Sequence, residues 1–513
     1  MTLIVLDFWQ MLALVQHELL LFAAVFFLIG ALDDMAVDAL WLWLKLRGRA
    51  RTPRLDRDGL RARPLHGPAA VLIPAWSEAS VIRETLSHML AAWPQADLRV
   101  YVGCYPNDPA TIAAAMRAAP GDERLRIVIH ECEGPSTKAD CLNRLYRALR
   151  EDEERAGADF AMILFHDAED MVDPAGLGLL DLAIARGADF AQLPVEPVVQ
   201  REGGFLARHL GSHYCEEFAE SHGKAMVVRD AIGAALPAAG VGCAVARGAL
   251  ERLRQRQAAR QGTGVVDLAM PFSADSLTED YELGLGIAEC GGSCRFVRAR
   301  GEDGRLVATR ALFPALLDHV VRQKTRWIHG IALQGWDRIG WTSNWLEIWM
   351  RGRDRRGPLT ALVLALGYVL LVLTGVLWGA QALGLAGPLT LTPLLEVLLF
   401  ANLATFAWRA AWRFAFTARS YGIVEGLRAV LRIPLANAVA IIAGRRAVSA
   451  YARTLAGRAI EWDKTPHASH PEHYPGIRAM GRPTGLGSPR TPRRIAFPPG
   501  RLAEGDVSGL AAS

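Results

Sequence analysis

The sequence predicts a mostly parallel α/β domain joined to a few membrane-spanning helices. Between residues 69 and about 300, short apolar runs rich in β-branched residues alternate with helical stretches, which is typical of a doubly wound sheet. Outside this region lie three longer apolar runs, each able to cross a hydrocarbon core of about 30 Å. The length of 513 residues fits one large domain with attached membrane segments.

Composition supports this mixture and excludes one class of partner. The chain is 51% hydrophobic, which is high for a soluble protein, and 21% charged, which is high for a polytopic bundle. The net charge of +4, from 57 basic and 53 acidic residues, predicts no nucleic-acid partner. The seven scattered cysteines contain no CxxC pair and are expected to be reduced cytosolic thiols.

One edge of the predicted sheet is a candidate ligand-binding site. Expected strands lie at 70–74, 98–105, 125–130, 161–166 and 190–194. Ligands bind at the carboxyl ends of strands in such sheets. His166, Asp167 and Glu169 directly follow the apolar run at 162–165, so the acidic cluster is predicted to lie at that edge.

The apolar runs predict a multi-pass membrane protein. The first span is expected within 18–43, and its basic flank at 45–63 predicts an external N-terminus and a cytoplasmic α/β domain. Two further spans are expected at 359–383 and 389–406. The segment 424–443 is apolar but contains arginines and a proline, so it is interpreted as interfacial or re-entrant, with a fourth span left open.

These segments divide the chain into five parts. They are an N-terminal transmembrane helix with its basic flank (1–48), a cytosolic domain (49–335), an interfacial Trp-rich segment (336–358), transmembrane and interfacial helices (359–465), and a disordered tail (466–513). The tryptophans at 336, 341, 345 and 349 suit a helix at the headgroup level, or equally a core-facing stripe. Asp33, Asp34 and Asp38 are expected to face protein, water or headgroups.

Three motifs carry candidate chemistry, and each also has a structural explanation. Asp167 and Glu169 offer two carboxylates that suit Mg²⁺ or Mn²⁺ bridged to a diphosphate, or form a solvated turn. Thr278-Glu279-Asp280 precedes an expected helix, as a capping turn or with Asp280 as a general base. The segment 323–327 combines an amide, a guanidinium and an aromatic face, or is an amphipathic helix at the membrane.

The order of these motifs resembles the inverting family-2 glycosyltransferases, especially their cellulose-synthase-like members. An acidic strand end, a Thr-Glu-Asp and a Q-x-x-R-W follow one another between about 71 and 327. Shorter matches at 73–78, 105–109, 138–143 and 462–467 look like the inner-membrane subgroup of the bacteriophage adsorption protein B type. The resemblance implies a GT-A fold, which is Rossmann-like with a mostly parallel sheet, in the cytosol beside α-helical transmembrane segments.

The resemblance also implies roles for individual residues. The catalytic residues would be Glu279, Asp280 and Arg326, with Asp280 as base and Arg326 stabilising the departing nucleotide. The implied donor-binding residues are Pro74, Glu78, Asp108, Lys138 and Asp167. Asp167 and Glu169 would bind Mg²⁺ or Mn²⁺, although Glu169 stands where a D-x-D pattern has its second Asp. Gln323 and Trp327 would line the acceptor side.

The function so implied is transfer of a sugar, with inversion, from a nucleotide-diphosphate donor to a glycan acceptor at the bacterial inner membrane. A UDP-sugar donor, a hexose and a role in exopolysaccharide synthesis come from the family resemblance alone. Membrane lipids and separate export proteins are further expected partners, because the few spans do not suit a self-contained polymer channel. A lipid-phosphate acceptor, and a non-catalytic membrane scaffold or receptor component, remain alternatives.

Overall fold

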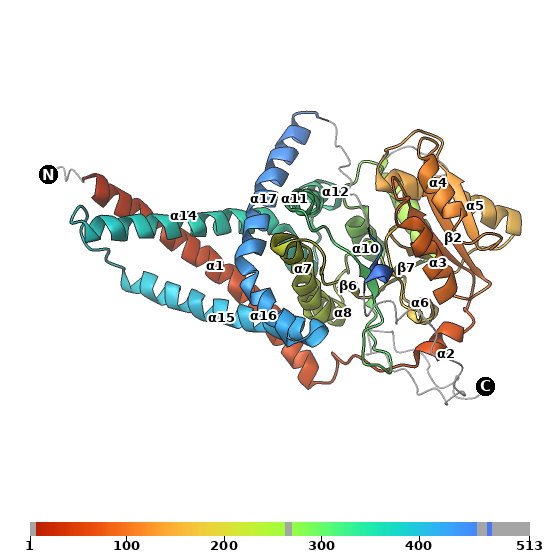
Figure 1. The fold of residues 1–513 in the computed structure, drawn as a ribbon, viewed down its shortest axis with the longest axis horizontal. Helices are drawn as coiled ribbons and strands as arrows, with labels where there is room; N and C mark the ends of the chain where they lie inside the picture. The colour runs from red at the N-terminus through yellow and green to blue at the C-terminus, as the bar shows by residue number, and fades with distance from the viewer. Residues whose placement is uncertain (1–6, 262–268, 459–468, 475–513) are drawn as a thin grey trace.

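The computed structural model describes residues 7–261, 269–458 and 469–474. A compact α/β part carries an elongated arm of long helices that projects from one side (Figure 1). The arm consists of α1 (Phe8–Leu46), α14 (Gly357–Ala382) and α15 (Pro393–Tyr421), in which α1 packs against both later helices. The two parts match the predicted combination of an α/β domain with membrane-spanning helices.

The α/β part is built on a seven-stranded sheet with the strand order β3-β2-β1-β4-β7-β5-β8. Neighbouring strands run parallel except for β7, which is antiparallel to β4 and β5. The strands are β1 (Ala69–Pro74), β2 (Leu98–Cys104), β3 (Leu125–Ile129), β4 (Met162–Phe165), β5 (Phe190–Gln192), β7 (Cys243–Ala246) and β8 (Cys294–Phe296). A small second sheet pairs β6 (Val195–Pro197) with β9 (Thr309–Ala311). All five expected strands are present, and the mostly parallel fold class is confirmed.

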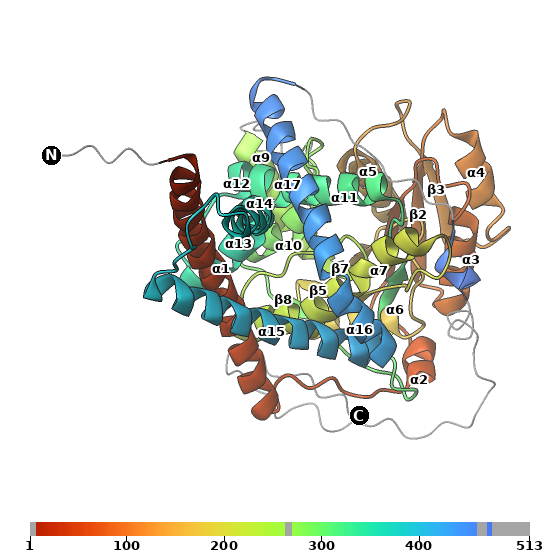
Figure 2. The same ribbon diagram turned by 60° about the vertical axis from the view of Figure 1, so that its left-hand side comes forward.

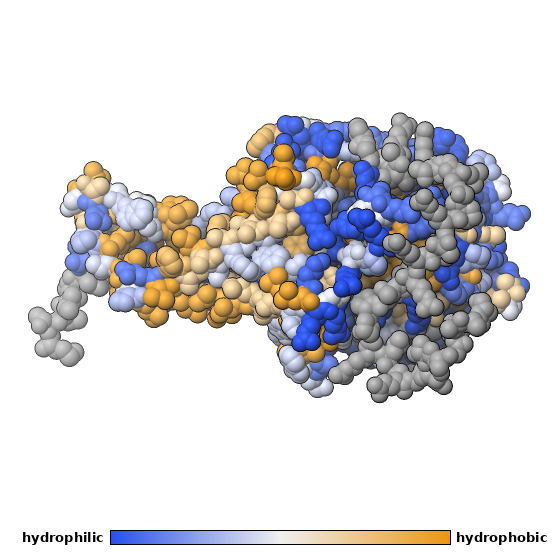
Figure 3. Space-filling view, turned by 90° about the horizontal axis from the view of Figure 1, so that it is seen from below, coloured by the Kyte–Doolittle hydropathy of each residue, from blue (hydrophilic) through white to orange (hydrophobic). Residues whose placement is uncertain are grey.

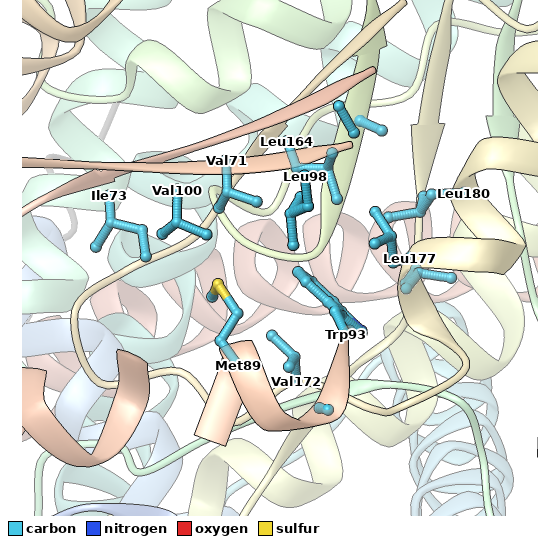
Figure 4. Close-up of a cluster of buried hydrophobic side chains, with 14 of the residues drawn as sticks. Val71, Ile73, Met89, Trp93, Leu98, Val100, Leu164, Val172, Leu177 and Leu180 are labelled. Atoms are coloured by element: carbon cyan, nitrogen blue, oxygen red, sulfur yellow. The ribbon is translucent and has the colours of Figure 1, made fainter. Parts of the chain in front are cut away.

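Alternating side chains of the central strands bury both faces of the sheet. Val71 and Ile73 of β1 contribute to one apolar core, while Ala70 and Leu72 contribute to the other. The first core packs against α3 (Ile82–Ala92), α4 (Pro109–Met116) and α6 (Gly176–Ala185). Figure 4 shows Trp93 and neighbouring apolar side chains beneath the strands. The second core packs against α5 (Lys138–Ala156), α9 (Arg247–Gln261) and α10 (Glu279–Glu289). Helices on both faces make the sheet doubly wound.

The remaining elements complete the α/β part and its junction with the arm. The helices of the α/β part are α2 (Arg57–Ala62), α3 (Ile82–Ala92), α4 (Pro109–Met116), α5 (Lys138–Ala156), α6 (Gly176–Ala185), α7 (Phe205–Glu220), α8 (Met226–Ile232), α9 (Arg247–Gln261), α10 (Glu279–Glu289) and α11 (Leu317–Trp327). A π-helical turn, η1 (Ser221–Ala225), joins α7 to α8, and another, η3 (Ile328–Gln334), follows α11.

Three helices are long and apolar enough to cross a membrane among the described residues: α1, α14 and α15. The space-filling view shows hydrophobic residues gathered along the arm and hydrophilic ones over the α/β part (Figure 3). The span expected within 18–43 lies inside the 39-residue α1, and α15 continues past residue 406 to Tyr421. The apolar 424–443 segment is divided between α16 (Ile423–Leu431) and α17 (Ile433–Leu455), which meet at 51°.

The carboxylates at the end of the first span face protein. Asp34 lies 2.9 Å from Arg353 and 2.7 Å from Arg356, and Asp33 also contacts both arginines. Asp38 is buried against Lys224 and accepts a 2.8 Å hydrogen bond from Trp408 Nε1. Asp33 and Asp34 thus join α1 to α13 (Trp345–Arg355) and to Arg356 after it, whereas Asp38 joins α1 to η1 and α15.

The Trp-rich segment is not one helix. Trp336 belongs to the short α12 (Gly335–Ile339), whereas Trp345 and Trp349 belong to α13, with an irregular turn between the two helices. Trp345 is 70% exposed, while Trp349 donates a 2.6 Å hydrogen bond to Asp33 Oδ1. The segment therefore combines exposed and protein-facing tryptophans, and the expectation of a single helical stripe is wrong.

A short stretch of the C-terminal tail, most of which is expected to be disordered, packs on the α/β part. Residues 469–474 include the short 3₁₀ turn η4 (Pro471–His473), and His470 is buried. The Tyr474 hydroxyl donates a 2.7 Å hydrogen bond to Gln200 Oε1. Residues 466–468 and 475–513, and the whole 462–467 match, lie outside the described residues.

Candidate active site

A cavity of about 150 Å³ lies at the carboxyl ends of β1 and β4 and reaches across to α11. Every predicted site residue except Asp108 lines it: Pro74, Glu78, Lys138, Asp167, Glu169, Glu279, Asp280, Gln323, Arg326 and Trp327. These residues come from six separate elements or loops. The fold therefore brings the three motifs together at the edge where the parallel strands end.

The acidic turn after β4 is shaped by Asp170. Its Oδ2 accepts a 2.9 Å hydrogen bond from the backbone N–H of Asp167 and lies 3.0 Å from Nδ1 of the buried His166. Burial raises the pKa of Asp170, although the hydrogen bond and charge of His166 oppose this shift. Asp170 thus fixes the turn that presents Asp167 and Glu169, a role that no local sequence pattern reveals.

Lys138 is the cation at the centre of the acidic groups. It is the first residue of α5, and Thr137 before it caps the helix by accepting from the backbone N–H of Asp140. Lys138 Nζ lies 2.5 Å from Asp167 Oδ1 and 3.5 Å from Glu279 Oε1. Burial opposes its charge, but Asp167, Glu279 and Asp280 outweigh burial and raise the pKa of Lys138.

The first turn of α10 carries the Thr-Glu-Asp motif. Thr278 occupies the cap position but makes no side-chain capping hydrogen bond, which weakens the interpretation of the motif as a capping turn. Burial raises the pKa of Glu279 to about 7, with Lys138 opposing this shift and Asp280 adding to it. Burial likewise raises the pKa of Asp280 against the opposing effect of Lys138. Both carboxyls thus bind protons more tightly than in water.

The backbone at Gly240 closes over Asp280. Gly240 has a φ of +79°, and a Cβ atom there would lie 2.6 Å from Asp280 Oδ2 and 3.5 Å from Lys138 Nζ. The close approach requires a residue without a side chain. The segment from Gly240 into β7 therefore forms a wall beside the Asp280 carboxylate.

The end of β1 and the loop after it form one side of the cavity. Pro74, Trp76 and Glu78 line it, whereas Asp108 does not. Asp108 instead accepts a 2.7 Å hydrogen bond from the backbone N–H of Ser77 and caps α4 through the N–H of Thr111. Asp108 therefore supports the loop from behind, and its predicted contact with the nucleoside stays a prediction.

Helix α11 and an aromatic wall form another side of the cavity. Gln323, Arg326 and Trp327 of α11 line the cavity together with Phe218 and Phe313. Tyr214, which is fully buried behind this wall, lies 4.4 Å from Phe313 and 6.0 Å from Trp327 between ring centroids. Phe218 and Phe313 were not predicted, because no local pattern marks them and only the fold brings them beside Trp327.

The carboxylates fit a divalent cation that is shared with a diphosphate. Among residues 7–261, 269–458 and 469–474, no three His, Cys, Asp or Glu side chains converge as a complete metal site. Asp167 and Glu169 line the same cavity as Lys138. Mg²⁺ is commonly held by one or two carboxylates together with substrate phosphates and water, so two ligands suffice for this arrangement.

His209 and His213, which the i, i+4 spacing marks as possible metal ligands or acceptor contacts, do not line this cavity. His213 is buried, and its Nδ1 lies 2.5 Å from the carbonyl oxygen of Leu210. Burial lowers the pKa of His213 to about 4, so its ring is neutral at neutral pH. These histidines belong to the packing of α7.

Comparisons with known proteins agree with the motifs. Residues 66–330 match the family model described as glycosyltransferase like family 2. Bacteriophage adsorption protein B of Escherichia coli is 31% identical over 471 residues, which is 86% of this chain and 61% of that protein. The same protein from a second Escherichia coli strain gives the same values. The chain thus spans about three fifths of the length of these relatives.

The chain is also similar to solved structures of two other proteins. A mannosyltransferase from Pyrobaculum calidifontis, in complex with GDP-mannose and Mn²⁺, is 17% identical with a TM-score of 0.48, covering 81% of this chain and 98% of its own. Glucosyl-3-phosphoglycerate synthase of Mycobacterium tuberculosis is 18% identical with a TM-score of 0.33, covering 57% of this chain and 88% of its own.

Proposed function

Because the chain belongs to glycosyltransferase family 2, we propose that it transfers a sugar from a nucleotide-diphosphate donor, with inversion, onto a glycan acceptor beside the inner membrane. The observation that carries this proposal is the convergence in one cavity of Lys138, two acidic motifs and the acceptor helix α11. A diphosphate, a reacting sugar and an acceptor hydroxyl need these groups within reach of one another.

The donor side of the cavity suits a nucleoside diphosphate. Lys138 supplies a half-buried positive charge for the phosphates, and Glu78 lies on the loop that would face the nucleoside. Asp167 and Glu169 would hold Mg²⁺ or Mn²⁺, which neutralises diphosphate charge when bound. A UDP-sugar and a hexose are the donor and sugar that the family resemblance favours.

Asp280 is proposed as the general base. The acceptor hydroxyl oxygen attacks the anomeric carbon, and the bond from that carbon to the diphosphate oxygen breaks with its electron pair leaving on the diphosphate. The hydroxyl proton passes to Asp280, whose raised pKa makes it a better proton acceptor than an exposed aspartate. A single displacement inverts the configuration at the anomeric carbon.

The other groups around Asp280 prepare this step. Arg326 lines the same cavity and would stabilise the negative charge that develops on the departing nucleotide. Glu279 is buried against Lys138 and holds that ammonium in place between the two motifs. Gln323 and Trp327 would contact the acceptor, the latter by stacking on a sugar ring.

The arm suggests where the reaction occurs. Three helices long enough to span a membrane lead into the α/β part, and basic residues flank the ends that join it. The positive-inside tendency supports a cytoplasmic cavity close to the membrane surface. A product made there fits exopolysaccharide synthesis, with export left to separate proteins and membrane lipids surrounding the arm.

An assay of Asp280→Asn tests the chemistry. Purified protein with Mn²⁺ or Mg²⁺ is expected to release nucleoside diphosphate from a matching nucleotide sugar, and Asp280→Asn to lose this turnover by about two orders of magnitude. Asp275→Asn is the matched control, because Asp275 precedes the same motif but is exposed and does not line the cavity. Wild-type turnover in Asp280→Asn would remove that residue from the base role.

Two alternatives remain distinguishable. A lipid-phosphate acceptor would give a single-sugar glycolipid, whereas a growing glycan gives longer products, so the length of radiolabelled product separates them. A non-catalytic scaffold or receptor component would bind no nucleotide sugar in the presence of divalent metal. Both acidic motifs keep their carboxylates, and these carboxylates line one cavity, which favours catalysis over a scaffold.

A further inference from the structure

A charged contact behind the aromatic wall holds the acceptor helix. Lys324 of α11 forms an ion pair with Glu217 of α7, and neither residue lines the cavity. Lys324 Nζ also lies 4.8 Å from the ring centroid of Tyr214 and 4.9 Å from that of Trp327. One ammonium therefore contacts a carboxylate and two rings at the same time.

The rings connect this ammonium to the cavity. Tyr214 packs on Phe313 and meets Trp327 edge to face, and both Phe313 and Trp327 line the cavity. A cation over an aromatic face attracts the ring and restricts its orientation. Lys324 precedes Trp327 by three residues on α11, so its fixed position limits how the tryptophan can turn.

The partner helix is itself firmly held. Glu216, next to Glu217 on α7, is completely buried and lies 3.0 Å from Arg413 of α15 and 2.7 Å from Arg432, between α16 and α17. Consecutive residues of α7 thus contact the arm-side helices and the acceptor helix. Figure 2 shows α7 between α16–α17 and the α/β sheet.

The Glu217 carboxylate is charged under working conditions. Its burial alone would favour the neutral acid, but Lys324 and then His213 outweigh burial and lower the pKa of Glu217 to about 2. Removing either partner therefore leaves a partly buried charge that must find new contacts. The neighbouring rings would then lose their fixed arrangement.

We propose that Lys324, held by Glu217, is a positioning residue that orients the Trp327 ring toward the acceptor. This inference rests on the proposed function, because it assigns Trp327 to the acceptor side. On this proposal, the Lys324–Glu217 ion pair affects the ratio of sugar transfer to donor hydrolysis. Donor binding, which uses the opposite wall of the cavity, does not depend on it.

The ratio of transfer to hydrolysis tests the proposal. Inverted membrane vesicles that contain the full chain and its native acceptors are incubated with radiolabelled UDP-glucose, UDP-galactose or UDP-N-acetylglucosamine, each with Mn²⁺. Label in glycan is compared with free labelled sugar. Lys324→Met and Glu217→Gln are each expected to lower the ratio about tenfold while total donor consumption changes less than about twofold.

Further variants separate positioning from general damage. Lys324→Arg keeps the charge and should retain most of the ratio, and the Lys324→Met/Glu217→Gln double variant should be no worse than either single one. Arg322→Met is the matched control, since Arg322 is an exposed cation on the same helix. If Lys324→Met fails to accumulate, Glu217→Gln and Lys324→Arg still decide the matter.

The contrary results are distinct. A fall in total donor consumption with an unchanged ratio, or additive losses in the double variant, would overturn the positioning role while leaving the proposed function intact. A wild-type protein that consumes none of the three donors would instead count against the proposed function and its UDP-sugar donor.

Discussion

Substitution of Gly240 by alanine is the sharpest test of where the reaction centre lies. The added Cβ would lie 2.6 Å from Asp280 Oδ2, whereas ordinary contact begins at 3.4 Å, so the carboxylate must move by about 0.8 Å. The side chain can rotate away, so the fold should survive. A displacement of about 1 Å at a reacting group can lower turnover by about a hundredfold, and we expect a loss of that order.

Gly233→Ala provides the control for backbone strain. Gly233 has a φ of +71°, close to the +79° of Gly240, but a Cβ there meets no atom within 4 Å. Both variants should lose about 1 kcal/mol of stability from the left-handed backbone, seen as similar decreases in Tm. Only Gly240→Ala should lose release of nucleoside diphosphate. Equal turnover in the two variants would refute the assignment of the reaction to the carboxylate beside Gly240.

Three further predictions concern charge. The pKa of Glu279 is about 7 in the folded protein, so the stability that its protonated form contributes to the wild type is lost as pH rises from about 4.5 to 7. Glu279→Gln does not titrate and should therefore gain stability relative to wild type over that range. The Tm of both proteins at pH 5 and pH 8 checks this. Asp167→Asn should raise the Mn²⁺ concentration needed for half-maximal turnover at least tenfold, and a metal titration with unchanged half-saturation would contradict the assignment. Lys224→Met should lower stability by about 3 kcal/mol, because it leaves the Asp38 carboxylate buried beside a lost partner, while the exposed Lys45→Met should not; thermal unfolding in detergent compares the two.

Much of the candidate active site could be predicted, because its position follows from local sequence and from the topology of the sheet. Apolar runs located the strands, and the rule that ligands bind at strand carboxyl ends placed Asp167 correctly. Resemblance in motif order then linked it to Asp280 and Trp327. The structure confirms that these residues share one cavity, which no single motif could establish.

Other features depended on contacts between distant segments. Phe218 and Phe313 join the cavity only because α7 and the strand β9 region pack beside α11. Asp108 matched a motif, yet its side chain is used to cap α4 and hold Ser77, which a motif cannot reveal. The tryptophan spacing predicted one helix, but the chain turns between Trp336 and Trp345.

The arm also shows what composition alone leaves open. Apolar length predicted three spans, and three helices meet that description in the described ranges. Composition gave no partner for Asp33 and Asp38, whose charges are balanced by arginines and a lysine from distant segments. The sequence predicts only that these aspartates face protein, water or headgroups, and the fold is needed to identify their partners.

The most direct measurement is sugar transfer by the full chain in lipid nanodiscs. A panel of radiolabelled nucleotide sugars is supplied with Mn²⁺ or Mg²⁺, and both nucleoside diphosphate release and labelled acceptor are followed. Our account predicts that at least one donor is consumed, that one nucleoside diphosphate is released for each sugar transferred or hydrolysed, and that Asp280→Asn abolishes both. Absence of donor binding and turnover across the whole panel would contradict it.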